Sequence, residues 1–503
     1  MSNPNPPAPA PRPSRRLVWL GCLALALYAW FLAHHGTVVA GGADSSGYFN
    51  SAKLFTEGRL ATPLRVPPEF LDGGNFEPLH FLPLGFMPAA DRSILNPTYP
   101  TGLPLHLAPA AELLGWEYGA HVVFIGAALG AVWLTYLSAR SLGLTPVLAG
   151  AGAIMLGAFP VFLFTAVQPL SDTLATAWAL AAIYSGLRAA EGRNGWAVTS
   201  GAALAFAVLV RPSNLLLAPA LLVLIGWDWR RWFWFGLGGV PGAAWQAFYN
   251  QHLYGHALRS GYGNISESFG IHFGGPTTLH FAKWLAMLLP SVVLVLPLAT
   301  LTQRGFRRRE LLGLALAFGA IAGCYAFYEV SHEVWWCLRF ILPGVPALVL
   351  AALLGVEALA RGPGQRWPVT FRPIAAGALA LWAVGASWYW SPRLSIYLMR
   401  HYEQAYADGV IAAKQQLPTN AAVLCEAFSG ALYFSTEFIV MRWDQINTDA
   451  FKKYSAAAAR TGRPVCAVLF DSEQDDAFRR CAGEWTRIGT VRNVGLWQLA
   501  RRP

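Results

Sequence analysis

The chain has 503 residues, of which 55% are hydrophobic and only 13% are charged, and its formal net charge is +10. This composition, with a mean hydropathy of +0.39, excludes a soluble globular protein and predicts an α-helical polytopic membrane protein. The positive charge does not indicate a nucleic-acid partner, because the arginines occur in short clusters between apolar runs of membrane-spanning length. The expected partner is therefore the lipid bilayer.

Residues 1–16 are rich in proline and polar side chains, so we expect a disordered cytoplasmic N-terminus. The apolar run after Arg16 has no small-residue cleavage site, which favours an uncleaved span over a signal peptide. Within residues 17–391 we expect about eleven transmembrane helices. They start near Leu17, His121, Pro146, Thr173, Ala197, Leu215, Trp232, Phe281, Glu310, Leu338 and Pro373.

Arginine is distributed unevenly between the two sides of these runs. If the N-terminus is cytoplasmic, the arginine clusters all fall on the cytoplasmic side, and the short outer loops keep only Arg211, Arg259 and Arg339. Cytoplasmic loops of membrane proteins carry this excess of positive charge. The sequence therefore predicts a cytoplasmic N-terminus and, after eleven spans, a periplasmic C-terminus, most simply in a bacterial inner membrane.

Two large polar segments then share the outer face. The first outer loop, residues 36–120, is rich in proline and aromatic residues, with a helical pattern over 48–56, and we expect short helices at the membrane interface. The tail, residues 392–503, alternates helical patterns with strand patterns, which predicts a small extracytoplasmic α/β domain. The predicted helices are 402–416 and 474–485, and the predicted strands are 422–425, 438–443, 464–470, 487–491 and 495–499.

Two aspartates stand where apolar runs meet the outer face. Asp44 follows the first run, and Asp172 lies between the third and fourth. An ionised aspartate costs about 2.5 to 3.5 kcal/mol at the bilayer centre, so a carboxylate at a span boundary is a candidate functional group. The alternative is helix capping, by Asp44 for a helix beginning at Tyr48 and by Ser171 or Asp172 for the next span. We take both aspartates as candidate catalytic residues and Tyr48 as a candidate substrate-binding residue.

Two arginines lie on the side that normally excludes positive charge. Arg211 precedes a proline inside an apolar stretch, where a guanidinium needs an anion or carbonyl partner. Arg339 ends an outer loop that also contains His332 and Glu333, together with two tryptophans typical of an interfacial belt. We expect Arg211, Arg339, His332 and Glu333 to contact substrate.

This set of charges suits a particular chemistry. A carboxylate deprotonates a hydroxyl acceptor while arginine neutralises a departing phosphate, because the planar guanidinium matches phosphate oxygens and stays charged. The histidines and six cysteines lack metal-ligand or redox spacing, and we find no P-loop, dinucleotide-binding fingerprint or serine-hydrolase elbow. No cofactor is expected, and a divalent metal has no support. Cys466 and Cys481 are either a disulfide or ordinary buried thiols.

The layout resembles the GT-C superfamily of glycosyltransferases, which take a sugar from a polyprenyl phosphate, and within it the protein mannosyltransferase and aminoarabinose transferase group. The resembling pieces run in family order along most of the chain: Asp44-Ser45-Ser46-Gly47-Tyr48 with Ala52, Gly58-Arg59-Leu60, Pro97-Thr98-Tyr99-Pro100-Thr101-Gly102, Gln168-Pro169-Leu170-Ser171-Asp172, Arg211-Pro212-Ser213-Asn214, Arg339-Phe340-Ile341-Leu342-Pro343 and Phe428-Ser429-Gly430. In the tail, Ser429-Gly430 and Arg442-Trp443-Asp444 resemble the soluble domain of bacterial members, and this resemblance implies that the domain helps to frame the acceptor.

The resemblance implies an integral membrane, inverting hexosyl- or pentosyltransferase acting on an extracytoplasmic hydroxyl of a lipid, glycan or protein. It implies Asp44 as the base, Arg339 as the leading phosphate contact, Arg211 as a weaker one, and Asp172 as a group that orients donor sugar or acceptor. The chain departs from some relatives in having a single acidic residue in the first loop and eleven rather than thirteen spans. The resemblance therefore implies no particular sugar or acceptor, and it makes metal dependence less expected.

A chain with many membrane spans and few charged residues also fits two other functions. A transporter or lipid-linked flippase would place its charges near the bilayer midplane and would show paired repeats with broken helices. Here the charges cluster on one face, and no such repeat is evident. A non-catalytic membrane scaffold, whose tail binds a partner, is separated from an enzyme only by a turnover assay.

Overall fold

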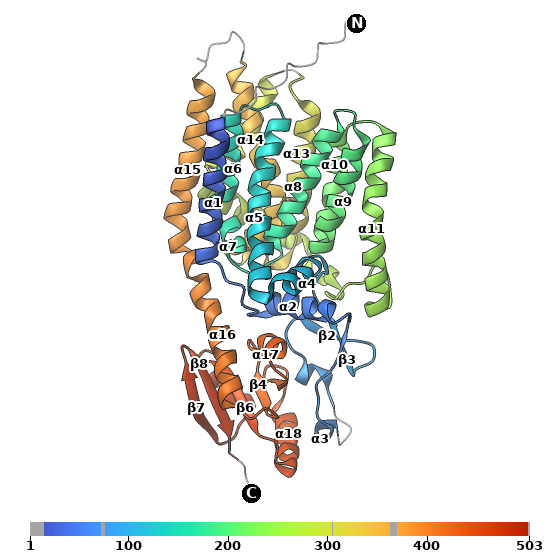
Figure 1. The fold of residues 1–503 in the computed structure, drawn as a ribbon, viewed down its shortest axis with the longest axis vertical. Helices are drawn as coiled ribbons and strands as arrows, with labels where there is room; N and C mark the ends of the chain where they lie inside the picture. Colours follow the sequence, from blue (N-terminus) through green and yellow to red (C-terminus); the bar gives the residue numbers. More distant parts are fainter. Residues whose placement is uncertain (1–14, 72–75, 304, 363–369, 501–503) are drawn as a thin grey trace.

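The computed structural model describes residues 15–71, 76–303, 305–362 and 370–500. Long helices form a bundle at one end of the molecule, and a sheet-containing domain forms the other (Figure 1). Helix α15 (Phe371–Arg393) runs along the bundle and is followed by α16 (Met399–Gln416), which enters the domain. The polar first loop lies at the same end of the bundle as this domain, as the arginine distribution predicts.

Each of the eleven predicted span starts lies in a helix or a broken helix of the bundle. The helices are α1 (Arg15–His35), α5 (Trp116–Ser141), α6 (Pro146–Gly157) with α7 (Pro160–Ala166), α8 (Asp172–Ala189), α9 (Asn194–Val210), η2 (Pro212–Leu217) with α10 (Ala218–Ile225), α11 (Trp229–Tyr254), α12 (Gly274–Leu288), α13 (Arg308–Ala326), η8 (Trp335–Gly344) with α14 (Val345–Ala360), and α15.

By length and composition alone, three helices of the described chain can cross a membrane: Trp116–Ser141, Arg308–Ala326 and Trp335–Ala360. The pair α6 and α7, bent by 61°, makes a fourth if it is one span. Proline explains the break, because Pro160 cannot donate the backbone hydrogen bond that would continue the helix. The number of spans therefore stays a prediction.

The first loop contains more regular structure than the sequence indicates. Helix α2 (Ala43–Thr56) begins five positions before the predicted start, and α4 (Gly102–Leu114) lies beside it across the end of the bundle (Figure 1). Between them a three-stranded antiparallel sheet forms in the order β1 (Thr62–Pro63), β3 (Ile94–Pro97), β2 (Phe86–Pro88). The short helices expected here are present, and the three strands are an addition that was not predicted, because strands this short show no alternating pattern.

The tail forms the predicted small α/β domain. Its five-stranded sheet has the order β5-β4-β6-β8-β7, with β4 parallel to β5 and β6, and with β8 antiparallel to β6 and β7. The strands are β4 (Ala422–Cys425), β5 (Ile439–Arg442), β6 (Val465–Phe470), β7 (Trp485–Val491) and β8 (Val494–Leu499). All four residues of β4 are buried, since helices cover both faces of the parallel part.

Three helices of this domain differ from expectation. Helix α19 (Gln474–Arg480) ends before the predicted 485, where β7 has already begun, and α17 (Ser429–Ser435) and α18 (Thr448–Thr461) were not predicted. Cys466 and Cys481 are both buried free thiols, so the disulfide alternative is not what the structure shows.

Helix α17 docks on α2 and joins the two outer segments. Asn50 donates a hydrogen bond to the Gly430 carbonyl at 3.0 Å, and Lys53 donates to the Phe434 carbonyl at 3.0 Å. The contact at Gly430 is so close that a Cβ there would overlap the Ser46 hydroxyl. The C-terminal domain therefore holds α2, the helix that carries Asp44, against the bundle.

Candidate active site

Asp44 is the second residue of α2 and does not cap it. The N-cap position belongs to Gly42, whose φ of 55° favours glycine, and no side chain makes a capping hydrogen bond there. The Asp44 carboxylate instead accepts a hydrogen bond from Arg339, with Nη1 to Oδ2 at 3.0 Å, and another from the Tyr99 hydroxyl. The capping explanation is therefore wrong for Asp44.

Asp172 is the first residue of α8, and again the cap position, Ser171, makes no side-chain capping bond. Its side chain is only 2% exposed and lies between two arginines. Arg211 donates to Asp172 Oδ1, and Arg339 Nη1 lies 3.8 Å from Asp172 Oδ2. Buried charges need such partners, because an unpaired ion in a low-dielectric site is strongly destabilising. The structure thus joins the four charged residues predicted from sequence in one alternating chain, Asp44–Arg339–Asp172–Arg211.

Aromatic rings support both guanidinium groups. Phe340 lies under the two arginines, with its ring centroid 5.4 Å from Arg339 Cζ and 5.6 Å from Arg211 Cζ. The Trp336 ring, which the sequence indicates only as part of an interfacial belt, lies 5.2 Å from Arg339 Cζ. Arg339 Nε is buried and makes no hydrogen bond within the described residues, although most buried donors in proteins are paired.

The surroundings of Asp44 keep it ionised. Burial acts to raise its pKa, but the Arg339 charge and the hydrogen bonds from Tyr99 and Arg339 outweigh that effect and lower the pKa below its usual value. Its side chain is still 32% exposed, so an acceptor can reach it. Asp44 is therefore a carboxylate at neutral pH that is accessible at the end of the bundle that carries the C-terminal domain.

Tyr48 connects the two acidic positions. Its hydroxyl donates a hydrogen bond to Ser171 Oγ at 2.9 Å, which ties α2 to the residue before Asp172. Burial and the nearby Asp44 charge raise the pKa of Tyr48 to about 12, so it remains a neutral hydroxyl. The structure places Tyr48 next to the charged residues, where its hydrogen bond holds α2 against the start of α8.

Tyr99 is the functional residue that sequence reasoning missed. It lies in the 97–102 segment that carries part of the family resemblance, but nothing in the residues marked it as a partner of Asp44. Its ring packs 5.0 Å from Tyr48, and a Cβ at Gly47 would overlap that ring, so α2 needs glycine at this close approach. Helix α2 therefore carries Asp44 and also packs against Tyr99, the residue that hydrogen-bonds to Asp44.

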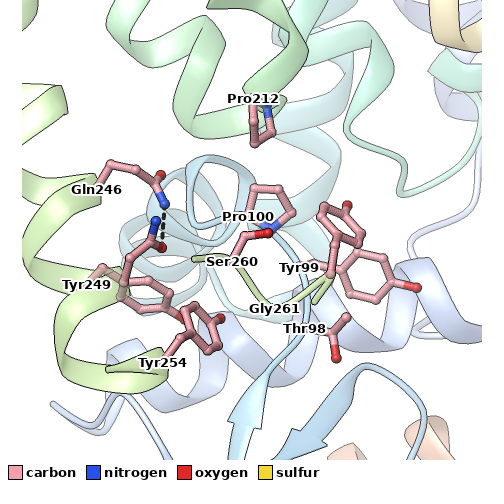
Figure 2. A pocket seen from close by; sticks show the side chains of 11 residues that line it. Thr98, Tyr99, Pro100, Pro212, Gln246, Tyr249, Tyr254, Ser260 and Gly261 are labelled. Carbon is pink, nitrogen blue, oxygen red and sulfur yellow. Dashed lines mark hydrogen bonds between the residues drawn. The ribbon is translucent and has the colours of Figure 1, made fainter. Parts of the chain in front are cut away.

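Tyr99 also lines a narrow pocket of about 10 Å³ beside the charged chain. Figure 2 shows Tyr99 and Pro100 facing Gln246, Tyr249 and Tyr254 of α11 across this space, with Gln246 hydrogen-bonded at 2.7 Å to Asn250. Hydroxyl, amide and aromatic groups dominate the lining. These are groups that contact sugars well, and the pocket has room for about one water-sized group before any side chain moves.

His332 and Glu333 lie apart from the charged chain. His332 packs against Phe273, with ring centroids 5.8 Å apart, and Glu333 is exposed. Within the described residues neither forms a hydrogen bond or ion pair with the four charged residues. Their substrate contacts stay a prediction. Among all the residues that the structure describes, no three His, Cys, Asp or Glu side chains lie close enough together to hold a metal ion.

Comparison with known proteins places this geometry in context. Residues 113–236 match the family model described as dolichyl-phosphate-mannose-protein mannosyltransferase. No curated protein sequence matches the chain. The fold is similar to that of ArnT from Cupriavidus metallidurans bound to undecaprenyl phosphate, with a TM-score of 0.59 and 14% identity over 97% of this chain and 98% of that one.

Two further solved structures share the fold. The oligosaccharyltransferase of Archaeoglobus fulgidus, tethered to an acceptor peptide, gives a TM-score of 0.54 with 12% identity over 96% of this chain and 74% of that one. The arabinofuranosyltransferase AftD from Mycobacteria gives 0.54 with 15% identity over 98% of this chain and 40% of that one. The chain therefore has the membrane fold of the GT-C glycosyltransferases, as the resemblance in its sequence predicts.

Proposed function

We propose that the protein is an integral membrane, inverting glycosyltransferase that moves a sugar from a polyprenyl-phosphate carrier to an extracytoplasmic hydroxyl of a lipid, glycan or protein. The alternating chain Asp44–Arg339–Asp172–Arg211 carries this proposal. It links the accessible Asp44 carboxylate to two half-buried arginines, Arg339 directly and Arg211 through Asp172. The fold comparison adds support, because the similar ArnT structure contains undecaprenyl phosphate.

In the proposed reaction, Asp44 takes the proton of the acceptor hydroxyl. The acceptor oxygen attacks the anomeric carbon from the face opposite the phosphate, the carbon–oxygen bond to the phosphate breaks, and its electron pair leaves on the phosphate oxygen. Configuration at that carbon is therefore inverted. A positioned general base of this kind contributes about 10² to 10⁴ in rate.

Arg339 is the group that meets the leaving phosphate. It has a free Nε donor, and its bond to Asp44 places the guanidinium next to the reacting hydroxyl. Once phosphate oxygens share the Arg339 charge, they weaken the influence that lowers the pKa of Asp44, so donor binding makes the carboxylate a better base. Arg211 is the second cation of this site.

The role of Asp172 is better described as positioning than as contact with sugar. Its carboxylate is buried, and its two oxygens face Arg211 and Arg339. A carboxylate held in this way fixes the spacing of the two guanidinium groups and leaves little surface for a substrate hydroxyl. This interpretation replaces donor or acceptor orientation as the proposed role of Asp172.

The substitution Asp44→Asn tests the proposal. Asparagine keeps the size and still accepts from Arg339, but it cannot act as a base, so turnover of a lipid-linked sugar should fall by about 10²-fold or more. Carrier binding and the melting temperature should stay near those of the parent. A variant that turns over within about threefold of the parent would remove Asp44 from the chemistry.

A further inference from the structure

A second polar cavity lies at the outer end of α1, away from the charged chain. It has a volume of about 430 Å³ and opens between α1, the start of α16 and the β7–β8 turn. In Figure 1 the end of α1 meets the top of α16, where the bundle joins the domain. The lining of this α1–α16 pocket includes one amide and five basic or imidazole side chains: Gln404, His34, His35, Arg400, His401 and Arg492.

The hydrogen bonds of the lining residues leave some of their donors unused. Arg492 Nη1 lies 3.2 Å from His401 Nδ1, and because arginine only donates, this nitrogen accepts. The proton of a neutral His401 is then on Nε2, which remains a donor. Arg400 uses Nη1 to bond the His34 carbonyl at 2.8 Å, and its other guanidinium nitrogens make no hydrogen bond within the described residues.

The charges of the pocket are not balanced. Asp408 neutralises Arg492, at 2.5 Å, and accepts from Gln404 at 3.2 Å, so both of its oxygens are engaged. Arg400 forms no ion pair with a carboxylate of the described chain. Two adjacent histidines, with ring centroids 4.9 Å apart, add imidazole nitrogens to the lining. The pocket therefore has an excess of positive charge that one carboxylate does not offset.

The position of the pocket relative to the membrane indicates which kind of anion lies near it. His34 and His35 are the last two residues of α1, and the preceding turns expose large apolar side chains, with Trp19 75% and Trp30 66% exposed. Such a surface faces lipid, so the histidines lie at the level of the outer headgroups. Donors that converge from α1, α16 and the β7–β8 turn suit a tetrahedral oxyanion better than a planar carboxylate.

We propose that the α1–α16 pocket is a binding site for a phosphate group, carried by an outer-leaflet lipid headgroup or by free phosphate. The pocket is distinct from the Asp44 site, since among the described contacts its lining residues bond to none of the four charged residues there. It is nevertheless close to that site along the chain. Residues 36–42 connect its histidines to α2, and a Cβ at Gly41 would overlap Glu403 and Tyr406 of α16.

The test measures phosphate binding to purified full-length protein in a non-ionic detergent. Calorimetric titrations use inorganic phosphate and, separately, dihexanoyl phosphatidic acid, a soluble lipid with a phosphate headgroup. The variant is Arg400→Gln, which keeps a donor for the His34 carbonyl but removes the charge. The control is Arg393→Gln, which removes an arginine at the end of α15 that contacts Tyr389 and does not line the pocket.

Loss of one charge-assisted contact should weaken binding about tenfold in Arg400→Gln, whereas Arg393→Gln should stay within about twofold of the parent. The titrations are repeated with the Arg339→Gln protein, so that phosphate binding at the Asp44 site does not contribute to the measured affinity. If that variant does not fold, the two other variants still give the answer. Tighter binding of the lipid assigns the site to a headgroup, and equal or tighter binding of inorganic phosphate assigns it to free phosphate. Absence of binding in the parent, or equal affinity in both arginine variants, overturns the proposal.

Discussion

Asp44 and Arg339, which are 295 positions apart in the chain, form an ion pair of 3.0 Å at the end of the helical bundle that faces the C-terminal domain. Asp44 comes from the helix that follows the first span, and Arg339 from the 3₁₀ segment η8 that leads into α14. This ion pair brings the proposed base and the proposed phosphate-binding residue next to each other. Changes to either residue therefore report on both binding and proton transfer.

Replacing Arg339 with lysine should weaken binding of the lipid-linked donor by about tenfold or more, although the charge is kept. A lysine ammonium is a point charge, and it cannot make the planar fork of bonds that the guanidinium offers to Asp44 and to a phosphate. Equilibrium binding of the polyprenyl-phosphate carrier measures the effect. Arg259→Lys, at an exposed outer position, is the matched control, and equal affinities of the two variants would contradict the assignment.

Replacing Tyr99 with phenylalanine should move the acidic limb of the kcat/KM profile to higher pH. The Tyr99 hydroxyl donates to Asp44 and lowers its pKa, so its loss raises that pKa. Asp44 must be ionised to act as a base, and activity is then lost at a higher pH as the solution becomes more acid. Tyr254→Phe, which lines the same pocket but bonds the Pro97 carbonyl, should leave the limb in place. An unshifted limb in Tyr99→Phe would show that this bond does not tune the base.

Replacing Gly430 with alanine should lower both stability and turnover, because the new Cβ overlaps the Ser46 hydroxyl on α2. Overpacking of this kind costs about 1 to 3 kcal/mol. Adding Ser46→Gly to the variant removes the overlapping hydroxyl and should restore part of the turnover. Gly275→Ala, which adds a Cβ with no atom within 4 Å, is the control. Thermal melting and turnover are measured together, and a Gly430→Ala protein indistinguishable from the control would refute the docking role.

A topology reporter that is active only outside the cytoplasm should be active when fused after Pro503 and silent when inserted after Arg309. The arginine distribution motivates both expectations. The structure agrees that the first loop and the C-terminal domain lie at one end of the bundle (Figure 1). A silent fusion after Pro503 would show that the C-terminus is cytoplasmic, which requires either an even number of spans or the opposite orientation of the N-terminus.

The residue types of the site were predictable, but their pairing was not. Asp44, Asp172, Arg211 and Arg339 each stand where a charge is costly near hydrocarbon, and that cost is visible in a single sequence. Which carboxylate meets which guanidinium depends on how distant helices pack. The same limit explains Tyr99, whose importance comes only from the close approach of α2.

The fold shows a similar division. Strands β4 and β6 were predicted to within one residue, because buried β-branched and aliphatic runs bounded by turn residues are a strong signal. The two-residue β1 and the seven-residue α17 are too short to show a period. They form because the first loop and the C-terminal domain pack on one another, which is tertiary information.

The bond between Asn50 and Gly430 has a consequence for biosynthesis. Its partners are separated by 380 residues, and a ribosome adds about 5 to 20 residues per second, so roughly 20 to 80 s pass between synthesis of the two. During that interval α2 has already been synthesised but lacks its contacts with α17. The proposed catalytic site is consequently completed last, when the C-terminal domain has been made and α17 docks on α2.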